Sequence, residues 1–201
     1  MLDGWAHRQI KPGLSSIAMR LVAAGVQANM VTYAGLGLGG AAATAIALQG
    51  YWAGLALILL SRLCDGLDGA VARIHGKTDF GGYLDIVLDF AFYGAVPLGF
   101  VIADPAANAI AGAVLLLAFY VNGASFLAYA IMAEKHGLTS NARGEKSLFF
   151  TTGLAEASET LAVFALMCLF PSWFPALAYS FAALTAYTTV SRMVLAGRRF
   201  G

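Results

Sequence analysis

Four aspartates stand at helical intervals in two neighbouring apolar segments of the chain. The first segment carries Asp65 and Asp68, and the second carries Asp85 and Asp89. A charged side chain in the apolar part of a membrane helix costs about 2.5 to 3.5 kcal/mol, so four unpaired carboxylates would cost roughly 10 kcal/mol or more. A cationic group must therefore offset the negative charge of this cluster.

The spacing of these aspartates suits a cation held between two helices. At about 100° per residue, Asp65 and Asp68 lie within roughly one third of the circumference of one helix. Asp85 and Asp89 are four positions apart and form a stripe on the next helix. Oxygen ligands from facing helices suit Mg²⁺, Mn²⁺ or Ca²⁺, and two such ions about 3.5 to 4 Å apart form a clamp for displacements at phosphorus. The spacing therefore indicates a divalent-cation site suited to phosphoryl chemistry.

Small residues share the helix faces of the carboxylates. Gly69 and Ala72 follow Asp68 on the first helix, and Gly81 lies one turn before Asp85. Because these residues carry no bulky side chain, a flat or phosphorylated ligand can approach the helix backbone beside the carboxylates.

Together these positions resemble the signature of the CDP-alcohol phosphotransferases, also called CDP-alcohol phosphatidyltransferases. That signature is D-x-x-D-G-x-x-A-R, seven or eight residues, then G-x-x-x-D-x-x-x-D, and this chain matches all eight fixed positions between Asp65 and Asp89. The resemblance implies a membrane enzyme of six helices, usually a homodimer, that acts in phospholipid biosynthesis. Such an enzyme moves a substituted phosphoryl group from a CDP-linked donor, such as CDP-diacylglycerol, to the hydroxyl of an alcohol or lipid acceptor and releases CMP.

The resemblance also implies a role for each matching residue. Two divalent cations, Mg²⁺ or Mn²⁺, would be held by Asp65, Asp68, Asp85 and Asp89. Asp89 would also serve as the general base that activates the acceptor hydroxyl. The CDP portion of the donor would be held by Asp68, Gly69, Ala72, Arg73 and Gly81.

The start of the preceding apolar segment adds two candidate donor contacts. The pattern Asn29-x-x-Thr32-x-x-Gly35 resembles the family's sequence at this point, although Ala28 stands where the family often has proline. Asn29 is also a candidate N-cap, and a helix N-terminus is a suitable neighbour for a nucleotide phosphate. The segment continues with small residues that predict close packing against another helix, namely Gly35, Gly37, Gly39 and Gly40.

The composition is that of an integral membrane protein. Of the 201 residues, 60% are hydrophobic and 11% are charged, whereas about one quarter of a soluble domain is charged. Because one span needs about 20 apolar residues, the length suits six spans and leaves no room for a second soluble domain. A formal net charge of +1 excludes a strongly basic nucleic-acid-binding protein. Cys64 and Cys168 lie in apolar runs without metal-type spacing and are expected to be buried thiols.

We therefore expect an all-α membrane protein that forms a single domain over residues 1–201. The six spans are expected at about residues 30–48, 51–74, 81–102, 108–132, 148–170 and 174–195. Residues 1–25 mix apolar and basic side chains and predict an interfacial amphipathic helix that precedes a catalytic domain of residues 26–201. The loop and terminal lysines and arginines fall on one side of this layout, so the positive-inside rule places both termini and the aspartates at the cytoplasmic face of the inner membrane.

Four further charged residues lie inside the expected spans with roles that the sequence leaves open. Arg62, one turn before Asp65, is either an ion-pair partner or a contact for the donor phosphate. Glu156 and Glu159 in the fifth span, with Arg192 in the sixth, form either a pocket for the acceptor or a structural ion pair.

The sequence leaves open the role of two polar residues in the expected fourth span. Asn122 and Ser125 either line a polar cavity or bond neighbouring helices, and we favour the second interpretation.

The alternative function is a cation transporter or channel, because intramembrane carboxylates also mark ion pathways. An inverted-repeat transporter would be expected to repeat the aspartate pattern in the second half of the chain, but the sequence contains no such repeat. Transport also gives no reason for the glycine and alanine positions of the signature. Glycerol phosphate, inositol phosphate, serine and a second lipid all remain possible acceptors.

Overall fold

The computed structural model describes residues 2–137 and 157–201, with side chains described from residue 13 onwards. In these ranges the regular structure consists of seven α-helices and one short 3-10 helix, without strands. The helices are α1 Leu2–Ala23, α2 Ala28–Ala47, α3 Tyr51–His75, α4 Asp79–Ala103, α5 Pro105–Lys135, α6 Ala157–Leu169, η1 Pro171–Trp173 and α7 Phe174–Phe200. The predicted all-α class is confirmed.

Three helices in the described ranges are long and apolar enough to cross a membrane, judged by length and composition: α2, α4 and α5. Helix α6 is a shorter apolar helix, and the part of the expected fifth span that precedes it lies outside the described residues. Helix α3 matches α4 in length, but Arg62, Asp65 and Asp68 interrupt its apolar sequence. The charged residues that indicate a cation site thus make α3 more polar than α4.

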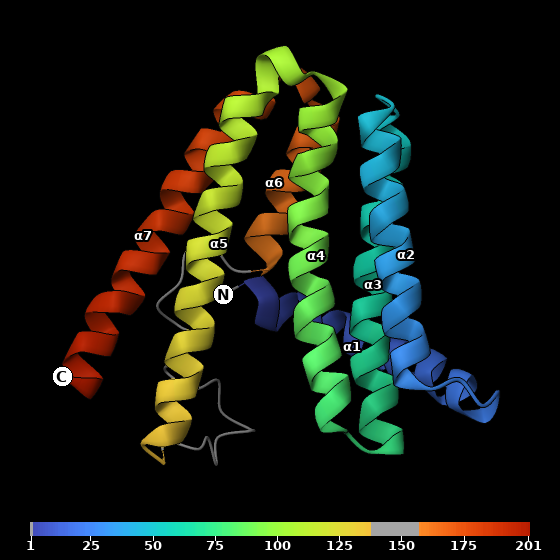
Figure 1. Ribbon diagram of the computed structural model, residues 1–201. Helices are drawn as coiled ribbons and strands as arrows, with labels where there is room; N and C mark the ends of the chain where they lie inside the picture. Colours follow the sequence, from blue (N-terminus) through green and yellow to red (C-terminus); the bar gives the residue numbers. More distant parts are fainter. Residues whose placement is uncertain (1, 138–156) are drawn as a thin grey trace.

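The long helices stand side by side, and α1 runs across them (Figure 1). Helix α2 packs mainly on α3 and α4, while α5 packs on α7 and α4. Aromatic side chains dominate the main core between these helices, where Phe92, Phe100, Phe164 and Phe174 are fully buried. This core holds α4 in the middle of the bundle, in contact with both α2 and α5.

The turn between α3 and α4 brings the two halves of the aspartate pattern together. It spans only residues 76–78, so α4 must run back antiparallel beside α3. Gly76 adopts a φ of +101°, a conformation that side chains with a Cβ atom disfavour. Thr78 caps α4 because its Oγ1 accepts a hydrogen bond of 3.0 Å from the N–H of Gly81. The end of α3 therefore lies beside the start of α4.

Two of the four α2 glycines allow the close packing that the sequence predicted. A Cβ atom added to Gly35 would lie 3.3 Å from Cβ of Cys64 on α3, and one added to Gly39 would lie 2.8 Å from the Phe92 ring on α4. Gly37 and Gly40 face open space instead. The two glycines that contact neighbouring helices are therefore four residues apart, which places them on one face of α2.

Helix α1 packs against the polar half of α3. Leu14 is buried beside Leu67, and Ala18 is buried beside Ala70 and Val71. Part of the apolar side of α1 therefore covers protein, next to the residues that carry the aspartate pattern.

Candidate functional site

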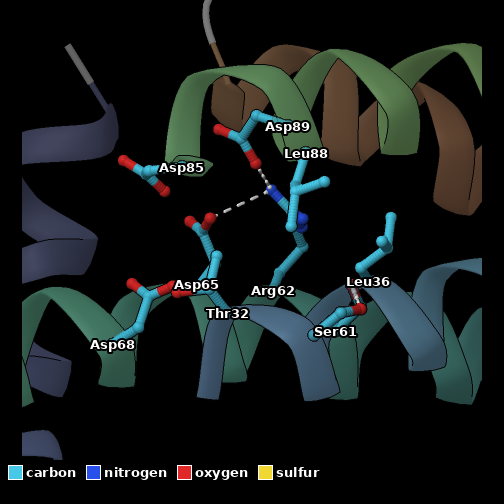
Figure 2. A pocket seen from close by; sticks show the side chains of 10 residues that line it. Thr32, Leu36, Ser61, Arg62, Asp65, Asp68, Asp85, Leu88 and Asp89 are labelled. Atoms are coloured by element: carbon cyan, nitrogen blue, oxygen red, sulfur yellow. Dashed lines mark hydrogen bonds and ion pairs between the residues drawn. The ribbon is translucent and has the colours of Figure 1, made fainter. Parts of the chain in front are cut away.

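The predicted carboxylates converge between α3 and α4 (Figure 2). Asp65, Asp85 and Asp89 each place one carboxylate oxygen within 4.8 Å of the other two. Asp68 lines the same pocket, together with Thr32 of α2. The spacing argument correctly predicted that two opposed helix faces would bring the acids together.

Arg62 stands among these acids as the counter-charge. Its Nη1 donates a hydrogen bond of 2.7 Å to Oδ1 of Asp89 and lies 3.5 Å from Oδ1 of Asp65. The guanidinium also stacks over the Phe92 ring, 3.9 Å from its centroid, and lies 5.6 Å from the centroid of Tyr93. The sequence left two roles open for Arg62, and the structure shows the first of them, an ion pair with the neighbouring aspartates.

Asp68 is the most deeply buried of the four acids. It is 6% exposed, and its Oδ2 has no hydrogen-bond partner among the residues that the structure describes. Its carboxylate points toward Thr32 (Figure 2). A buried carboxylate oxygen without a partner is destabilising, so this atom is suited to a ligand that the protein itself does not supply.

These acids fit a divalent cation. Two bonds of about 2.0 to 2.6 Å between a metal ion and oxygen span up to roughly 5 Å, which accommodates three oxygens within 4.8 Å of one another. Four carboxylates and one guanidinium leave an excess of three negative charges, if all are ionised. Hard oxygen donors with this excess charge suit Mg²⁺ or Mn²⁺.

The space enclosed between the acids is small. Its volume is about 10 Å³, which is roughly enough for one water-sized sphere. Asp85, on the outer side of the cluster, is exposed to solvent. A ligand larger than an ion can therefore approach the acids from the exposed side of the pocket, beside Asp85.

The predicted donor-binding residues lie on the three helices that line this pocket, α2, α3 and α4. Thr32 of α2 lines it, and Gly81 of α4 lies against α2, because a Cβ atom added there would be 3.3 Å from Oδ1 of Asn29. On α3, Gly69 lies beside the exposed Arg73, whose Nη1 would be 3.6 Å from an added Cβ atom. Ala72, one turn beyond Asp68, is half-buried.

The prediction that Asn29 caps α2 is wrong. The capping residue is Gln27, whose backbone is extended, and its side chain makes no capping hydrogen bond. The carbonyl of Gln27 already accepts the N–H of Met30, so the helix begins before Asn29. Asn29 lies inside the first turn of α2, with its side-chain oxygen close to Gly81.

A second polar cluster joins α5 to α7 around Arg192. The Arg192 guanidinium donates hydrogen bonds to the carbonyl and side-chain oxygens of Asn122, both at 3.0 Å, and to Oγ of Ser125 at 2.7 Å. Thr189 adds a bond of 3.3 Å to Asn122. The interpretation of Asn122 and Ser125 as residues that bond neighbouring helices is confirmed.

The structural ion pair proposed for Arg192 is not present with Glu159. Glu159 instead accepts a hydrogen bond of 3.0 Å from Ser158, its neighbour in α6. The ion-pair alternative is wrong for these two residues, because the neutral oxygens of α5 already occupy Arg192. Glu156 lies outside the described residues.

The sequence argument missed three residues that shape the site. Phe92 and Tyr93 form the aromatic surface beneath Arg62, and Ser61 donates a hydrogen bond of 2.8 Å to the carbonyl of Gly35. Phe92 stands three positions after Asp89 on α4. That helical spacing was a usable signal, since residues three apart share a face.

Known proteins resemble this chain over most of its length. The model of the CDP-alcohol phosphatidyltransferase family matches residues 26–195. Inner membrane protein YnjF of Escherichia coli is 46% identical over 193 residues, which cover 96% of this chain and 94% of that protein.

Solved structures of Mycobacterium tuberculosis phosphatidylinositol phosphate synthase PgsA1 share the fold. The apo form has a TM-score of 0.70 and 23% identity, and the alignment covers 90% of this chain and 94% of that one. The form with CDP-DAG bound has a TM-score of 0.64 and 24% identity, with 90% and 91% covered. Similarity at this level of identity establishes a common arrangement of helices.

Proposed function

Because this chain belongs to the CDP-alcohol phosphatidyltransferase family, we propose that it transfers a phosphatidyl group from a CDP-linked lipid to an alcohol, in phospholipid biosynthesis. The observation that carries this proposal is the convergence of Asp65, Asp85 and Asp89 with the buried Asp68. CDP-diacylglycerol is the proposed donor, and the structural similarity to PgsA1, solved with CDP-DAG bound, supports this choice.

Asp65, Asp68, Asp85 and Asp89 are the proposed ligands of two divalent cations, Mg²⁺ or Mn²⁺. When bound, these cations supply charge neutralisation at the diphosphate of the donor. The unpartnered Oδ2 of Asp68 and the close approach of the other three carboxylates support the assignment. PgsA1 has also been solved in complex with manganese and citrate, which supports a divalent metal in this chain.

Asp89 is the proposed general base. The acceptor oxygen forms a bond to the phosphorus that carries the lipid, the bond from that phosphorus to CMP breaks, and the acceptor proton passes to Asp89. The hydrogen bond from Arg62 engages Oδ1 of Asp89 and leaves the second oxygen to accept this proton. Arg62 thereby also holds the Asp89 carboxylate in one orientation.

The remaining site residues divide between donor and acceptor. We assign the CDP portion of the donor to Asn29, Thr32, Asp68, Gly69, Ala72, Arg73 and Gly81; all lie on the helices that line the pocket, and Thr32 and Asp68 line it directly. We assign the acceptor to the side of Glu156, Glu159 and Arg192. The partners of Arg192 on α5 are neutral oxygens, so its positive charge suits an acceptor that carries a hydroxyl or an anionic group.

The proposed membrane arrangement is a single domain over residues 1–201, with six spans in residues 26–201 and an interfacial α1. The relative YnjF is an inner membrane protein, which supports the same location here. Both termini and the aspartates would face the cytoplasm, where soluble acceptors are available. We also propose a homodimer, as the family resemblance implies.

Release of CMP tests this function against the transport alternative. We expect purified protein to release CMP from CDP-diacylglycerol when an alcohol acceptor is added, only after Mg²⁺ or Mn²⁺ is restored to EDTA-treated samples. A panel of glycerol phosphate, inositol phosphate, serine and lipid acceptors identifies the substrate. If liposomes containing the protein pass divalent cations while no acceptor yields CMP, the chain is a transporter and the enzymatic proposal fails.

A further inference from the structure

We propose that Arg62 is an internal counter-cation that competes with divalent cations for Asp65 and Asp89, and thereby lowers the metal affinity of the aspartate cluster. The inference rests on the proposed function, because it concerns the same carboxylates. Arg62 is not one of the eight fixed positions of the family signature, and its proposed role is to control the metal affinity of the cluster. The guanidinium would set how tightly the metal-free enzyme captures a cation before the donor arrives.

The contacts of Arg62 place it on the oxygens that a metal ion would use. One nitrogen, Nη1, lies 2.7 Å from Asp89 and 3.5 Å from Asp65. These are two of the three residues whose carboxylate oxygens lie within 4.8 Å of one another. The guanidinium and an incoming cation are therefore attracted to the same carboxylates.

An aromatic surface holds Arg62 in place independently of the acids. The guanidinium lies 3.9 Å from the centroid of the Phe92 ring, and the Arg62 side chain is only 16% exposed. Phe92 is itself 2% exposed, and its ring fits against α2 because Gly39 has no Cβ atom. We therefore expect Arg62 to stay beside the carboxylates when a cation binds, close enough to repel it.

Charge and ring contact, rather than a full set of hydrogen bonds, hold the Arg62 guanidinium. Its Nε is buried and has no hydrogen-bond partner among the described residues. Because a buried unsatisfied donor is destabilising, the attraction to Asp65 and Asp89 and the contact with the Phe92 ring must compensate for it. The guanidinium is therefore bound to the carboxylates mainly by its positive charge, which is the property that an incoming cation shares.

Metal affinity without donor tests the proposal directly. Binding of Mn²⁺ is measured by electron paramagnetic resonance on the full-length protein in detergent micelles. We expect Arg62→Gln to bind Mn²⁺ at least about tenfold more tightly than the wild type, because a positive charge a few ångströms from the ion is removed. Arg62→Lys keeps the charge and should remain close to the wild-type affinity.

Two further variants complete the comparison. Arg198→Gln removes the same charge at an exposed position near the end of α7, and it should leave the Mn²⁺ affinity unchanged. Arg62→Met is a second uncharged variant whose side chain can still pack on Phe92. It should reproduce the tighter binding if Arg62→Gln does not fold.

Distinct outcomes overturn the inference and the proposed function. If the uncharged Arg62 variants fold, bind Mn²⁺ no more tightly than the wild type, and only unfold at lower temperature, then Arg62 is structural and the inference is wrong. If Asp85→Asn binds Mn²⁺ as well as the wild type does, the cluster is not the metal site, and the proposed function fails together with the inference.

Discussion

The four aspartates occupy different surroundings, so their substitutions should have different effects. Asp89 and Asp65 share Arg62 as a counter-charge, whereas Asp68 is buried with one oxygen unpartnered among the described residues. Asp85 is exposed at the outer side of the pocket. An amide cannot replace a carboxylate as a metal ligand at the same strength, but it preserves size and most hydrogen bonding.

Asp65→Asn and Asp85→Asn should each abolish turnover. Each change removes a negatively charged ligand from a cluster that must hold divalent cations. The measurement is CMP release from EDTA-treated membranes after Mg²⁺ is restored. Near-normal release by either variant would contradict the two-cation assignment, provided that both proteins are present at wild-type amounts.

Asp89→Asn should impair proton transfer more than metal binding, because Asp65, Asp68 and Asp85 remain as charged ligands for the cations. The amide oxygen can still accept the hydrogen bond from Arg62 but cannot take up the acceptor proton. Turnover should therefore fall by about 10²-fold or more, while the affinity for the CDP-linked donor in Mg²⁺ changes little. A parallel loss of donor affinity, as expected for Asp65→Asn, would make Asp89 a metal ligand without a role as base.

At the scale of helices, close approach of α2 to α4 determines where the site residues lie. A Cβ atom added to Gly99 of α4 would lie 2.6 Å from the carbonyl oxygen of Ala43 in α2. Backbone cannot yield as a flexible side chain does, so the two helices would have to separate. The same two helices carry Thr32, Asp85 and Asp89 to the pocket.

Gly99→Ala should therefore destabilise the protein by about 1 to 3 kcal/mol, the usual cost of overpacking. We expect a lower midpoint of thermal unfolding in detergent and, in the folded fraction, reduced turnover. Gly40→Ala is the matched control, since Gly40 is helical and faces open space. It should be neutral or slightly stabilising, because alanine favours helix more than glycine does. Equal destabilisation by the two variants would contradict a close contact between α2 and α4.

At the scale of the whole molecule, the two ends of the bundle differ in charge. The α3–α4 turn lies at one end of the bundle, and η1 lies near the opposite end (Figure 1). Near η1, the ring of Phe174 stacks on that of Phe100, with the ring centroids 4.9 Å apart. The turn contains Lys77, while the residues of η1 have no charged side chain. The positive-inside rule therefore predicts that the α3–α4 turn faces the cytoplasm.

Cysteine labelling tests this orientation. In a chain whose native Cys64 and Cys168 are replaced by alanine, Ser172→Cys should react with a membrane-impermeant maleimide in intact cells. Lys77→Cys should react only after the membrane is permeabilised. Both positions are exposed in the structure, so accessibility to the reagent, rather than burial, decides the result. The reverse pattern would place the aspartates outside the cytoplasm.

The sequence alone determined the features that depend on local geometry. The aspartates recur at helical spacing on two consecutive apolar segments, so the sequence predicted that the two helices could turn their carboxylate faces toward each other. The apolar segments likewise predicted the helices, because backbone hydrogen bonds must be satisfied within each helix in an apolar environment. Family membership followed from the same short stretch of chain.

Only the tertiary structure decided which partners the other polar groups have. Arg62 is one turn from Asp65, yet its shorter contact is with Asp89 on α4, because Phe92 and Gly39 position the guanidinium there. Arg192 bonds to Asn122 on α5 rather than to Glu159, and Asn29 lies against Gly81 instead of capping its own helix. Such choices depend on which helices pack together and at what distance, and spacing along one helix contains no information about either.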